Sequence, residues 1–379
     1  MTHVCLGDVA REIKQKVPVD QELPTVGLEH LDPGEVELAH WDEGVKTTFT
    51  KAFSKGQVLF GRRRAYLRKA AVAPFDGICS GDITVIAPKD NLSPRLLPFI
   101  IQNDALFEHA ITNSAGSLSP RVKWQSLSQF EFELPSIAKQ EDLADILWTA
   151  QETRSHYRQL LTACDDVVKL QFVEMFGGPD TTESDCPPVT IGELAADIRY
   201  GTSKKASDSG EFKYLRMNNM TDDGRLDLSD LKYIDLSGAE LENAKVVRGD
   251  LLFNRTNSRE KVGKTCVFNK NEPMVIAGYI VRVRFDERVE PGYVSAFLNS
   301  SYGKGLLRKM AKGAVGQANI SAKEMAKIEL PLPPIELQRS FLDFAASVDK
   351  SKFAVQKALD ELNATTKKIL NQELGLGDV

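Results

Sequence analysis

The amino-acid sequence repeats itself once, with a period close to half of its 379 residues. An internal repeat constrains a fold strongly, because each copy must build the same structural unit. Three pairs of segments match in the same order: residues 6–10 with 191–195, 55–62 with 248–255, and 133–140 with 331–338. A chain of this length also exceeds one average domain. We therefore expect two similar domains.

Each copy combines a globular part with a helical part. In the globular parts, turn-forming residues separate strand-like runs at residues 57–60, 83–87, 250–253 and 276–285, a pattern typical of a mixed α+β domain. Prolines at position 135 and at positions 331, 333 and 334 disfavour helix there. They mark the junctions between the globular parts and the helices.

A seven-residue spacing of apolar residues follows each junction and predicts a coiled coil. The second copy has the clearer seam, formed by Val348, Val355, Leu362 and Ile369, with Ala345, Leu359 and Thr366 between them. The first copy has a weaker one, formed by Leu143, Leu147, Ala150, Tyr157, Leu161, Cys164, Val168 and Met175, which the Gly-Gly-Pro sequence at 177–179 ends. Two ordinary core helices are the alternative.

Charge is distributed unevenly along the chain, whose net charge is −5. Residues 61–75, 109–130 and 291–323 contain bases and no acid, so local basic surfaces are expected despite the acidic total. No apolar run approaches the roughly 18 residues of a membrane helix, and the first residues lack a secretory pattern. The five cysteines lie far apart, which indicates reduced thiols in a cytoplasm, packed in the interior, and no metal site.

Catalytic motifs are incomplete. Gly263-Lys264-Thr265 resembles the end of a phosphate-binding loop, but Ser258 replaces the glycine that such a loop requires. The Pro-Pro pairs at 187–188 and 333–334 lack the flanking residues of an adenine methyltransferase motif, and the five histidines are scattered. We expect no catalytic residue.

The order and duplication of these parts resemble the specificity subunits of type I restriction-modification enzymes. The resemblance covers nearly the whole chain and rests on Leu-Pro-Pro-Ile-Glu-Leu-Gln at 332–338, Ile-Arg-Tyr-Gly-Thr-Ser at 198–203 and Gly-Asp-Leu-Leu-Phe-Asn-Arg-Thr at 249–256. The first copy departs from the pattern, because Ser136 replaces the second proline and no Tyr-Gly-Thr is present.

The resemblance implies an α+β fold with two pseudo-symmetric globular target-recognition domains, joined by two long helices that form an antiparallel coiled coil. The expected division is residues 1–137 and 179–335 for the recognition domains, and 138–178 and 336–379 for the helices. Each domain would read one half of an interrupted target in double-stranded DNA. The implied partners are two modification (methyltransferase) subunits, which carry S-adenosylmethionine, and restriction subunits that translocate and cut DNA. This chain would hold no cofactor itself, lie in the cytoplasm and contact no membrane.

Arginine and lysine donate to guanine or phosphate, and asparagine and glutamine pair with adenine, so these residue types in the loops are the candidates for DNA contact. In the first copy they are Arg62, Arg63, Arg64, Arg68, Lys69, Arg121 and Lys123. In the second they are Lys204, Lys205, Arg216, Asn218, Asn219, Asn254, Arg255, Asn257, Arg259, Lys261, Lys264, Lys312, Gln317 and Asn319. Two other functions stay open: a self-contained DNA-modifying enzyme, and a coiled-coil assembly protein whose basic loops bind protein.

Overall fold

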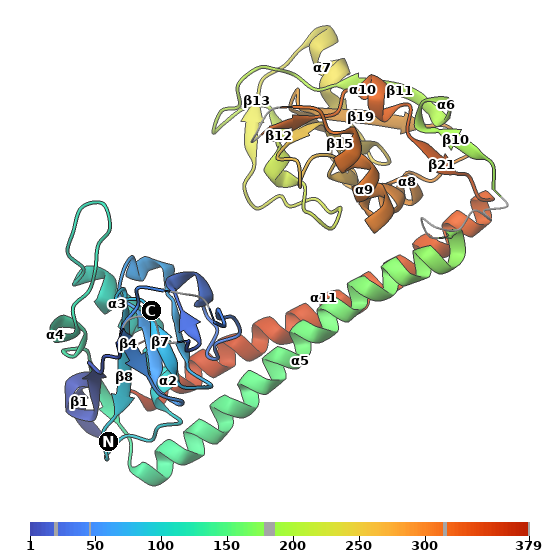
Figure 1. Cartoon of the computed structure of the whole chain (residues 1–379). Helices are drawn as coiled ribbons and strands as arrows, with labels where there is room; N and C mark the ends of the chain where they lie inside the picture. The colour runs from blue at the N-terminus through green and yellow to red at the C-terminus, as the bar shows by residue number, and fades with distance from the viewer. Residues whose placement is uncertain (19–21, 45–46, 178–185, 314–316, 378–379) are drawn as a thin grey trace. The chain divides into compact units, whose positions relative to one another are not determined.

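A computed structural model describes residues 1–18, 22–44, 47–177, 186–313 and 317–377 (Figure 1). The chain forms two compact units, of which the first comprises Met1–Leu160 with Ala354–Val379 and the second Leu161–Phe353. Each long helix therefore contributes to both units. The expected end of the first helix at residue 178 lies outside the described residues.

The first unit packs short helices against small β-sheets. Its main sheet has the order β2-β8-β5-β6, a second sheet has the order β3-β7-β4, and β1 pairs with β9. The elements are β1 (Thr2–Cys5), α1 (Leu6–Val9), β2 (Ala10–Ile13), β3 (Thr25–Val26), β4 (Lys51–Phe53), β5 (Val58–Gly61), β6 (Ala70–Val72), β7 (Gly77–Cys79), β8 (Ile83–Pro88), α2 (Leu97–Ile101), α3 (Asp104–Thr112), α4 (Trp124–Leu127) and β9 (Glu131–Leu134).

The second unit repeats this arrangement. Its main sheet has the order β11-β19-β15-β17, its second sheet the order β13-β12-β18-β14, and β10 pairs with β21. The elements are β10 (Pro188–Thr190), α6 (Ile191–Leu194), β11 (Ala195–Tyr200), β12 (Phe212–Leu215), β13 (Lys232–Ile234), α7 (Gly238–Ala244), β14 (Lys245–Val246), β15 (Leu251–Asn254), β16 (Thr256–Asn257), β17 (Thr265–Val267), β18 (Met274–Ile276), β19 (Ile280–Phe285), α8 (Pro291–Asn299), α9 (Ser301–Met310), β20 (Ala318–Asn319), α10 (Ala322–Met325) and β21 (Glu329–Pro331).

The cores of the two units use matching positions of the sequence repeat. Leu6 and Phe60 are fully buried in the first core, and their counterparts Ile191 and Phe253 are fully buried in the second. The backbone matches as well, because the N–H of Leu6 donates to Phe130 at 2.8 Å and that of Ile191 donates to Ile328 at 2.9 Å. The repeat detected in the sequence is therefore a repeat of the fold.

One predicted strand is wrong. The predicted range 276–285 covers the last residue of β18, a turn and the whole of β19, and the two strands belong to different sheets. The chain turns between them because the N–H of Ile280 donates to Ala277 at 2.8 Å and the N–H of Gly278 donates to Thr202 at 2.7 Å. A continuous apolar run conceals this turn, since both flanking strands are buried.

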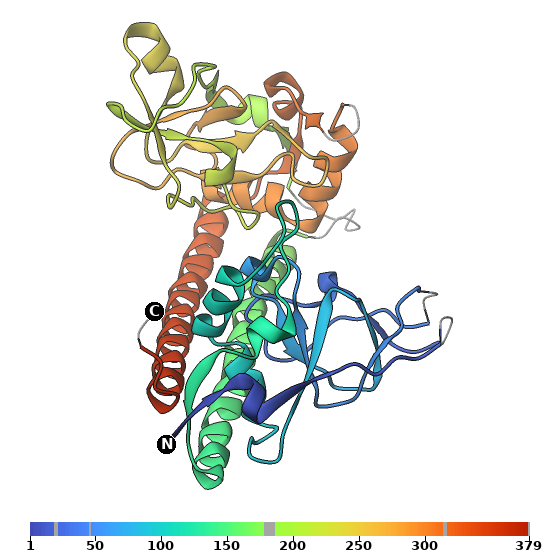
Figure 2. The same ribbon diagram turned by 90° about the vertical axis from the view of Figure 1, so that its left-hand side faces the viewer.

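The two long helices, α5 (Ile137–Phe176) and α11 (Ile335–Glu373), each begin one residue before the predicted start. In the first unit, Lys139 near the start of α5 pairs with Glu373 at the end of α11, at 3.0 Å. In the second unit, Phe172 near the end of α5 packs edge-on against Phe341 near the start of α11. The helices therefore run antiparallel in each unit and lie side by side (Figure 1 and Figure 2), which confirms the predicted coiled coil.

The predicted seam residues are all at least partly removed from solvent. Leu143, Leu147, Ala150 and Leu359 are buried, and the other seam positions are half-buried. The helix α5 ends at Phe176, and Gly177 then adopts a φ of 85°, which a glycine tolerates readily.

Cysteine burial was predicted correctly for two positions. Burial raises the pKa of both the Cys79 and the Cys266 thiols to about 12. Cys5, Cys164 and Cys186 are half-buried, which corrects the expectation of interior packing for these three. Cys5 ends the strand β1, Cys164 lies on α5 and Cys186 lies in the loop before β10, and the surrounding residues cover each of them only in part.

Candidate nucleic-acid interface

A short basic loop follows the central strand β5 of the first unit. Its residues Arg64 and Arg68 both adopt left-handed backbone conformations, with φ values of 54° and 50°. Such conformations are strained for a residue other than glycine and occur often at functional sites. Arg64 is exposed at this turn. The sequence therefore places an exposed arginine on a strained, well-defined backbone.

A second loop lies against this one and joins two of the acid-free windows. Arg63 and Arg121 form an isolated antiparallel bridge, and the backbone N–H of Arg64 donates to Pro120 at 2.7 Å. Arg121 also bridges to Ala115, so the second loop closes on itself. Basic residues from two distant parts of the sequence thus lie side by side.

Asp82 holds this pair of loops together, although no sequence motif contains it. Its carboxylate accepts from Nε of Arg121 at 2.7 Å and from Nη1 of Arg63 at 3.3 Å. The hydrogen bond from Arg121 is the main reason why the pKa of Asp82 is lowered, and Arg63 adds to it. Its backbone oxygen also accepts the N–H of Arg62 at 2.9 Å. The sequence indicates a tight turn before β8, but it does not indicate that Asp82 in this turn pairs with arginines distant in the sequence.

The remaining candidates of the first unit have other surroundings. Arg68 forms ion pairs with Asp104 and Glu108 of α3, so acids from outside its window neutralise it. Lys69 donates to the backbone oxygen of Leu28 at 2.8 Å. Lys123 is exposed directly before α4. Lys123 is exposed and forms no ion pair with the acids that the structure describes.

In the second unit the corresponding loops form a small sheet. The strand β16 follows β15 and pairs with β20, with Thr256 opposite Asn319 and Asn257 opposite Ala318. Thr256 donates its hydroxyl to Oδ1 of Asn319 at 2.9 Å. Asn257 accepts the N–H of Ser258 at 2.9 Å. The structure thus brings the loop after the central strand together with the third acid-free window.

Arg255 is the basic residue at the start of this small sheet. Its guanidinium lies over the ring of Tyr200, 5.1 Å from the centroid, in a cation–π contact. The hydroxyl of Tyr200 in turn accepts the N–H of Ala322 at 3.0 Å. Tyr200 stands in the Tyr-Gly-Thr motif, and only the fold brings it beside Arg255.

Two asparagine candidates serve the fold instead. Asn254 is fully buried and accepts the N–H of Thr256 at 3.3 Å. Asn219 is 1% exposed and donates to the backbone oxygens of Asp227 and Asp230. A buried amide whose hydrogen bonds hold a turn cannot reach a base edge, so we leave both residues out of the interface.

Several other candidates of the second unit have acidic partners. Lys204 pairs with Glu240, Lys264 with Asp222, and Lys312 with Glu324. Arg216 and Asn218 both contact Asp230. Lys205, Arg259, Lys261 and Gln317 are exposed. The exposed basic residues and the basic residue at the small sheet are therefore the better candidates for contact with an anionic ligand.

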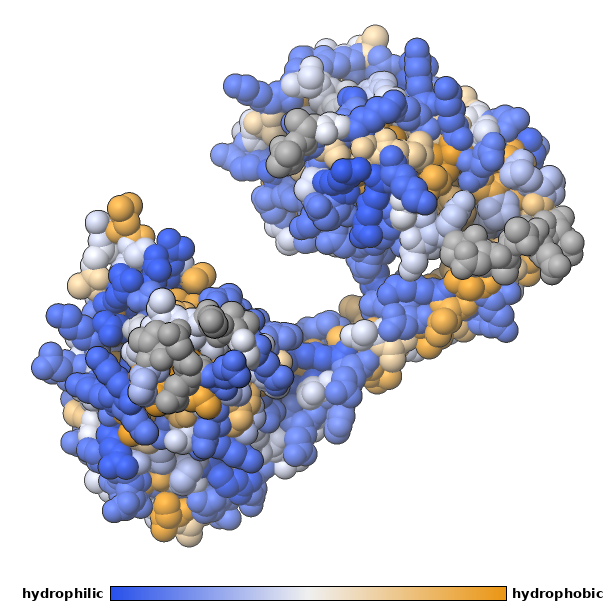
Figure 3. All heavy atoms as spheres, viewed as in Figure 1, coloured by the Kyte–Doolittle hydropathy of each residue, from blue (hydrophilic) through white to orange (hydrophobic). Residues whose placement is uncertain are grey.

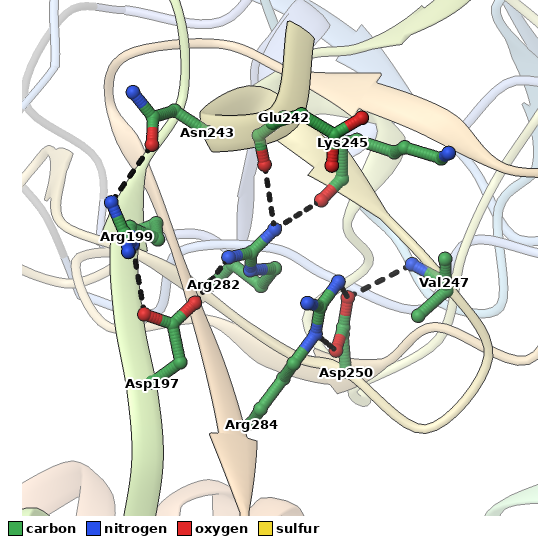
Figure 4. Close-up of polar contacts among 9 residues, drawn as sticks. All are labelled: Asp197, Arg199, Glu242, Asn243, Lys245, Val247, Asp250, Arg282 and Arg284. Carbon is green, nitrogen blue, oxygen red and sulfur yellow. Dashed lines mark hydrogen bonds and ion pairs between the residues drawn. The ribbon is translucent and has the colours of Figure 1, made fainter. Parts of the chain in front are cut away.

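A network of arginines pins α7 to the main sheet of the second unit (Figure 4). Arg282 is 2% exposed and donates to the backbone oxygens of Glu242 and Lys245 and to the carboxylate of Asp197. Arg284 pairs with buried Asp250 at 2.7 Å. Burial works to raise the pKa of Asp197, but its hydrogen bonds to arginine outweigh this and lower it. Arg282 therefore stabilises the fold and is buried away from any ligand, whereas Arg284 fixes Asp250 and keeps a partly exposed side chain.

The anchored helix α7 positions residues of the loop that follows β11. Glu240 of α7 accepts from the hydroxyl of Thr202 at 2.6 Å and pairs with Lys204 at 2.7 Å. The hydrogen bond from Lys204 is the main reason why the pKa of Glu240 is lowered. The buried network therefore fixes where the Tyr-Gly-Thr loop runs.

The described residues contain no group of three or more histidine, cysteine or acidic side chains that could hold a metal ion. Within the same residues, no helix is long and apolar enough to cross a membrane. The described surface instead carries basic and amide side chains on two equivalent sets of loops, one in each unit.

Comparisons with known proteins identify this repeated architecture. The family described as type I restriction modification DNA specificity domain matches residues 2–159 and 184–372. The specificity subunit of the type I restriction enzyme EcoKI from Escherichia coli is 24% identical over 286 residues, which cover 70% of this chain and 62% of that protein. A putative type I specificity subunit, MjaX, from Methanocaldococcus jannaschii is 25% identical over 222 residues, 54% of this chain and 50% of that protein. The matches thus span about half to two thirds of the length of these two relatives.

Solved structures show the same fold. A chain from a structure on complex assembly and conformational transition of the type I R-M system matches all of this chain and 98% of its own length, with a TM-score of 0.62 and 19% identity. The crystal structure of a type I restriction-modification S subunit from M. genitalium matches 100% of this chain and 96% of its own, with a TM-score of 0.56 and 12% identity.

Proposed function

This chain belongs to the type I restriction-modification DNA specificity family, and on that premise we propose that it selects the DNA target of a type I complex. Each unit would bind one half of an interrupted target in double-stranded DNA. The observation that carries the proposal is the repetition of one loop framework, in which a basic residue follows the central strand of each unit: Arg62 after β5 and Arg255 after β15.

The proposed role is recognition and positioning, and the chemistry would belong to partner subunits. S-adenosylmethionine would bind to two modification subunits, and restriction subunits would join that complex in the cytoplasm. A chain with two similar halves can present two equivalent faces to two identical partners.

Exposed apolar side chains on the long helices support a protein partner there. In the second unit Val167, Leu170 and Val173 of α5 and Phe353 of α11 are exposed. Figure 3 shows hydrophobic side chains along the outer surface of these helices. Apolar surface that a protein leaves in water marks an interaction site when it is contiguous. We therefore assign the helices to subunit docking and the loops to DNA.

The test is to express the full chain with the modification subunit of its own host in cells that lack DNA methylation, and to sequence the methylated positions. We expect one bipartite motif, with two short specific parts separated by unspecific base pairs, that disappears when either subunit is omitted. Methylation by the chain alone would make it an enzyme in its own right. A complex that forms but methylates no defined sequence would make the chain an assembly protein.

A further inference from the structure

Arg121 and Asn319 occupy equivalent positions in the two units. The residue after each donates its N–H to the first residue after the central strand: Val122 to Arg62 at 3.0 Å, and Ile320 to Arg255 at 2.9 Å. Arg121 bridges to Arg63, and Asn319 pairs with Thr256 one position further along the loop. One backbone framework therefore presents an arginine in the first unit and an asparagine in the second.

The guanidinium of Arg121 is oriented by a carboxylate. Its Nε donates to Oδ1 of Asp82 at 2.7 Å, and its Nη2 donates to Oδ2 at 3.3 Å. These two contacts use one edge of the planar group. The Nη1 amine has no hydrogen-bond partner among the residues that the structure describes, and the side chain is 43% exposed. The terminal edge of the fork is thus left for a ligand.

Arg63 has a different task, although it shares the same carboxylate. Its Nη1 donates to Asp82 at 3.3 Å and its Nη2 donates to the hydroxyl of Ser119 at 3.1 Å. Both of its terminal nitrogens are therefore used within the protein. Arg63 orients Asp82 and joins it to the loop that carries Arg121, which makes it a positioning residue.

We propose that Arg121 reads a guanine in the half-site bound by the first unit, with Asp82 as its positioning residue, and that Asn319 reads an adenine at the corresponding place in the other half-site. An arginine fork donates to both O6 and N7 of guanine, and an asparagine amide pairs with N6 and N7 of adenine. The inference rests on the proposed function, because it assumes that each unit binds DNA.

The surroundings of Arg121 favour a base over a phosphate. A phosphate needs only positive charge, and the ionised carboxylate of Asp82 beside Arg121 would repel it. The edge of a guanine is neutral and requires two donors in a fixed plane, which the Asp82 contact provides. For Asn319, the hydroxyl of Thr256 fixes the amide in the same way, at 2.9 Å from Oδ1.

The experiment uses the full chain in complex with the modification subunit, a plasmid library with randomised half-sites, and sequencing of the methylated products. Arg121→Lys keeps the charge but removes the fork. We expect discrimination for guanine at one position of the first half-site to fall by about 5- to 150-fold, the worth of one bidentate base contact. Asp82→Asn should weaken discrimination at the same position, and Asn319→Ala should relax one adenine position of the second half-site.

The matched control is Arg95→Lys, which changes an arginine of similar exposure that pairs with Asp145 of α5, away from the loops. It should leave both half-sites unchanged. A second readout needs no variant: 7-deazaguanine at the assigned position, which lacks the N7 acceptor, should weaken binding of the wild-type complex and have little effect on Arg121→Lys. This arm also covers the case in which a variant fails to fold.

The outcomes distinguish a failure of the Arg121 assignment from a failure of the proposed function. An unchanged guanine preference in Arg121→Lys, or equal weakening of all sequences, would overturn the assignment of Arg121 while the bipartite motif of the wild type stands. A wild-type complex without any defined motif would instead overturn the proposed function.

Discussion

Gln140 and Gln338 make the same hydrogen bonds in the two units, each at the start of its long helix. The side-chain oxygen of Gln140 accepts the N–H of Ser93 at 2.8 Å, and that of Gln338 accepts the N–H of Glu290, also at 2.8 Å. Their amides donate to the backbone oxygens of Pro135 at 3.0 Å and Pro333 at 2.8 Å. Both side chains are buried. The glutamine that follows the Leu-Pro junction therefore fastens the globular part to the helix.

This role predicts the stability of a simple variant. Gln338→Ala leaves the partly buried N–H of Glu290 and the backbone oxygens of Arg288 and Pro333 without this partner, which should cost about 1–3 kcal/mol of the free energy of unfolding. Chemical denaturation measures this. Gln356→Ala, an exposed glutamine on the same helix, is the matched control and should change stability by less than about 0.5 kcal/mol. Equal effects of the two substitutions would contradict the role of Gln338.

The contact between Arg255 and Tyr200 predicts a selective effect on DNA recognition. Tyr200→Ala removes the ring beneath the guanidinium, so recognition of the second half-site should weaken while the first half-site is read as before. The contact is worth about 0.5–2 kcal/mol. Tyr200→Phe keeps the ring and loses only the hydroxyl that accepts from Ala322, so it should retain most of the recognition. Methylation sequencing of each variant complex gives the comparison.

Arg255→Ala and Asn257→Ala should likewise alter the second half-site alone. A lost base contact should cost about 1–3 kcal/mol at one base pair. If either variant weakens all sequences equally, that residue contacts phosphate.

Salt should weaken DNA binding steeply, because basic loops bind phosphates by releasing counterions. We expect the purified chain to bind DNA weakly alone and more tightly with its modification subunits. Binding titrations at increasing salt measure the slope for both. A flat response of the complex between low and moderate salt would contradict binding led by phosphate contacts.

The carboxylate of Asp82 should titrate below the usual range of an aspartate. Its pKa is lowered mainly by the hydrogen bond from Arg121. Because the folded-state pKa is depressed, the stabilisation is present above the unfolded pKa and is lost as pH falls through the folded one. An NMR titration of the side-chain carboxyl measures this, and Arg121→Ala should move the pKa back up. An Asp82 pKa at the ordinary value in the wild type would show that the cluster does not form in solution.

The paired helices should set the spacing between the half-sites. Four residues inserted near exposed Ala163 add about 6 Å of helix and preserve the seam approximately. The recognised target should lengthen by one or two base pairs with both half-sites kept, as methylation sequencing would show. A single inserted residue turns the seam by about 100° and should instead impair assembly. An unchanged spacing with full activity after the four-residue insertion would show that the helices do not set the distance between the half-sites.

The sequence by itself determined the repeat, the junctions and the coiled coil, because these depend on local properties. Prolines at positions 135 and 333 cannot stand in the interior of a helix, and a seven-residue apolar spacing places Val348 and Val355 on one helical face. The basic windows were likewise visible as composition. Composition could not tell which basic side chains remain free of acidic partners and can contact a ligand.

Tertiary structure alone decided that. Asp82 reaches Arg121 across 39 residues, Arg68 is neutralised by α3, and Arg282 is buried among backbone oxygens. Ion pairs and cation–π contacts form between side chains that the fold brings within a few ångströms. The separation of these residues in the sequence does not predict such contacts. The turn at Ala277 was hidden in part for the same reason: Ala277 accepts the N–H of Ile280 locally, but the N–H of Gly278 donates to Thr202, which only the folded unit brings close.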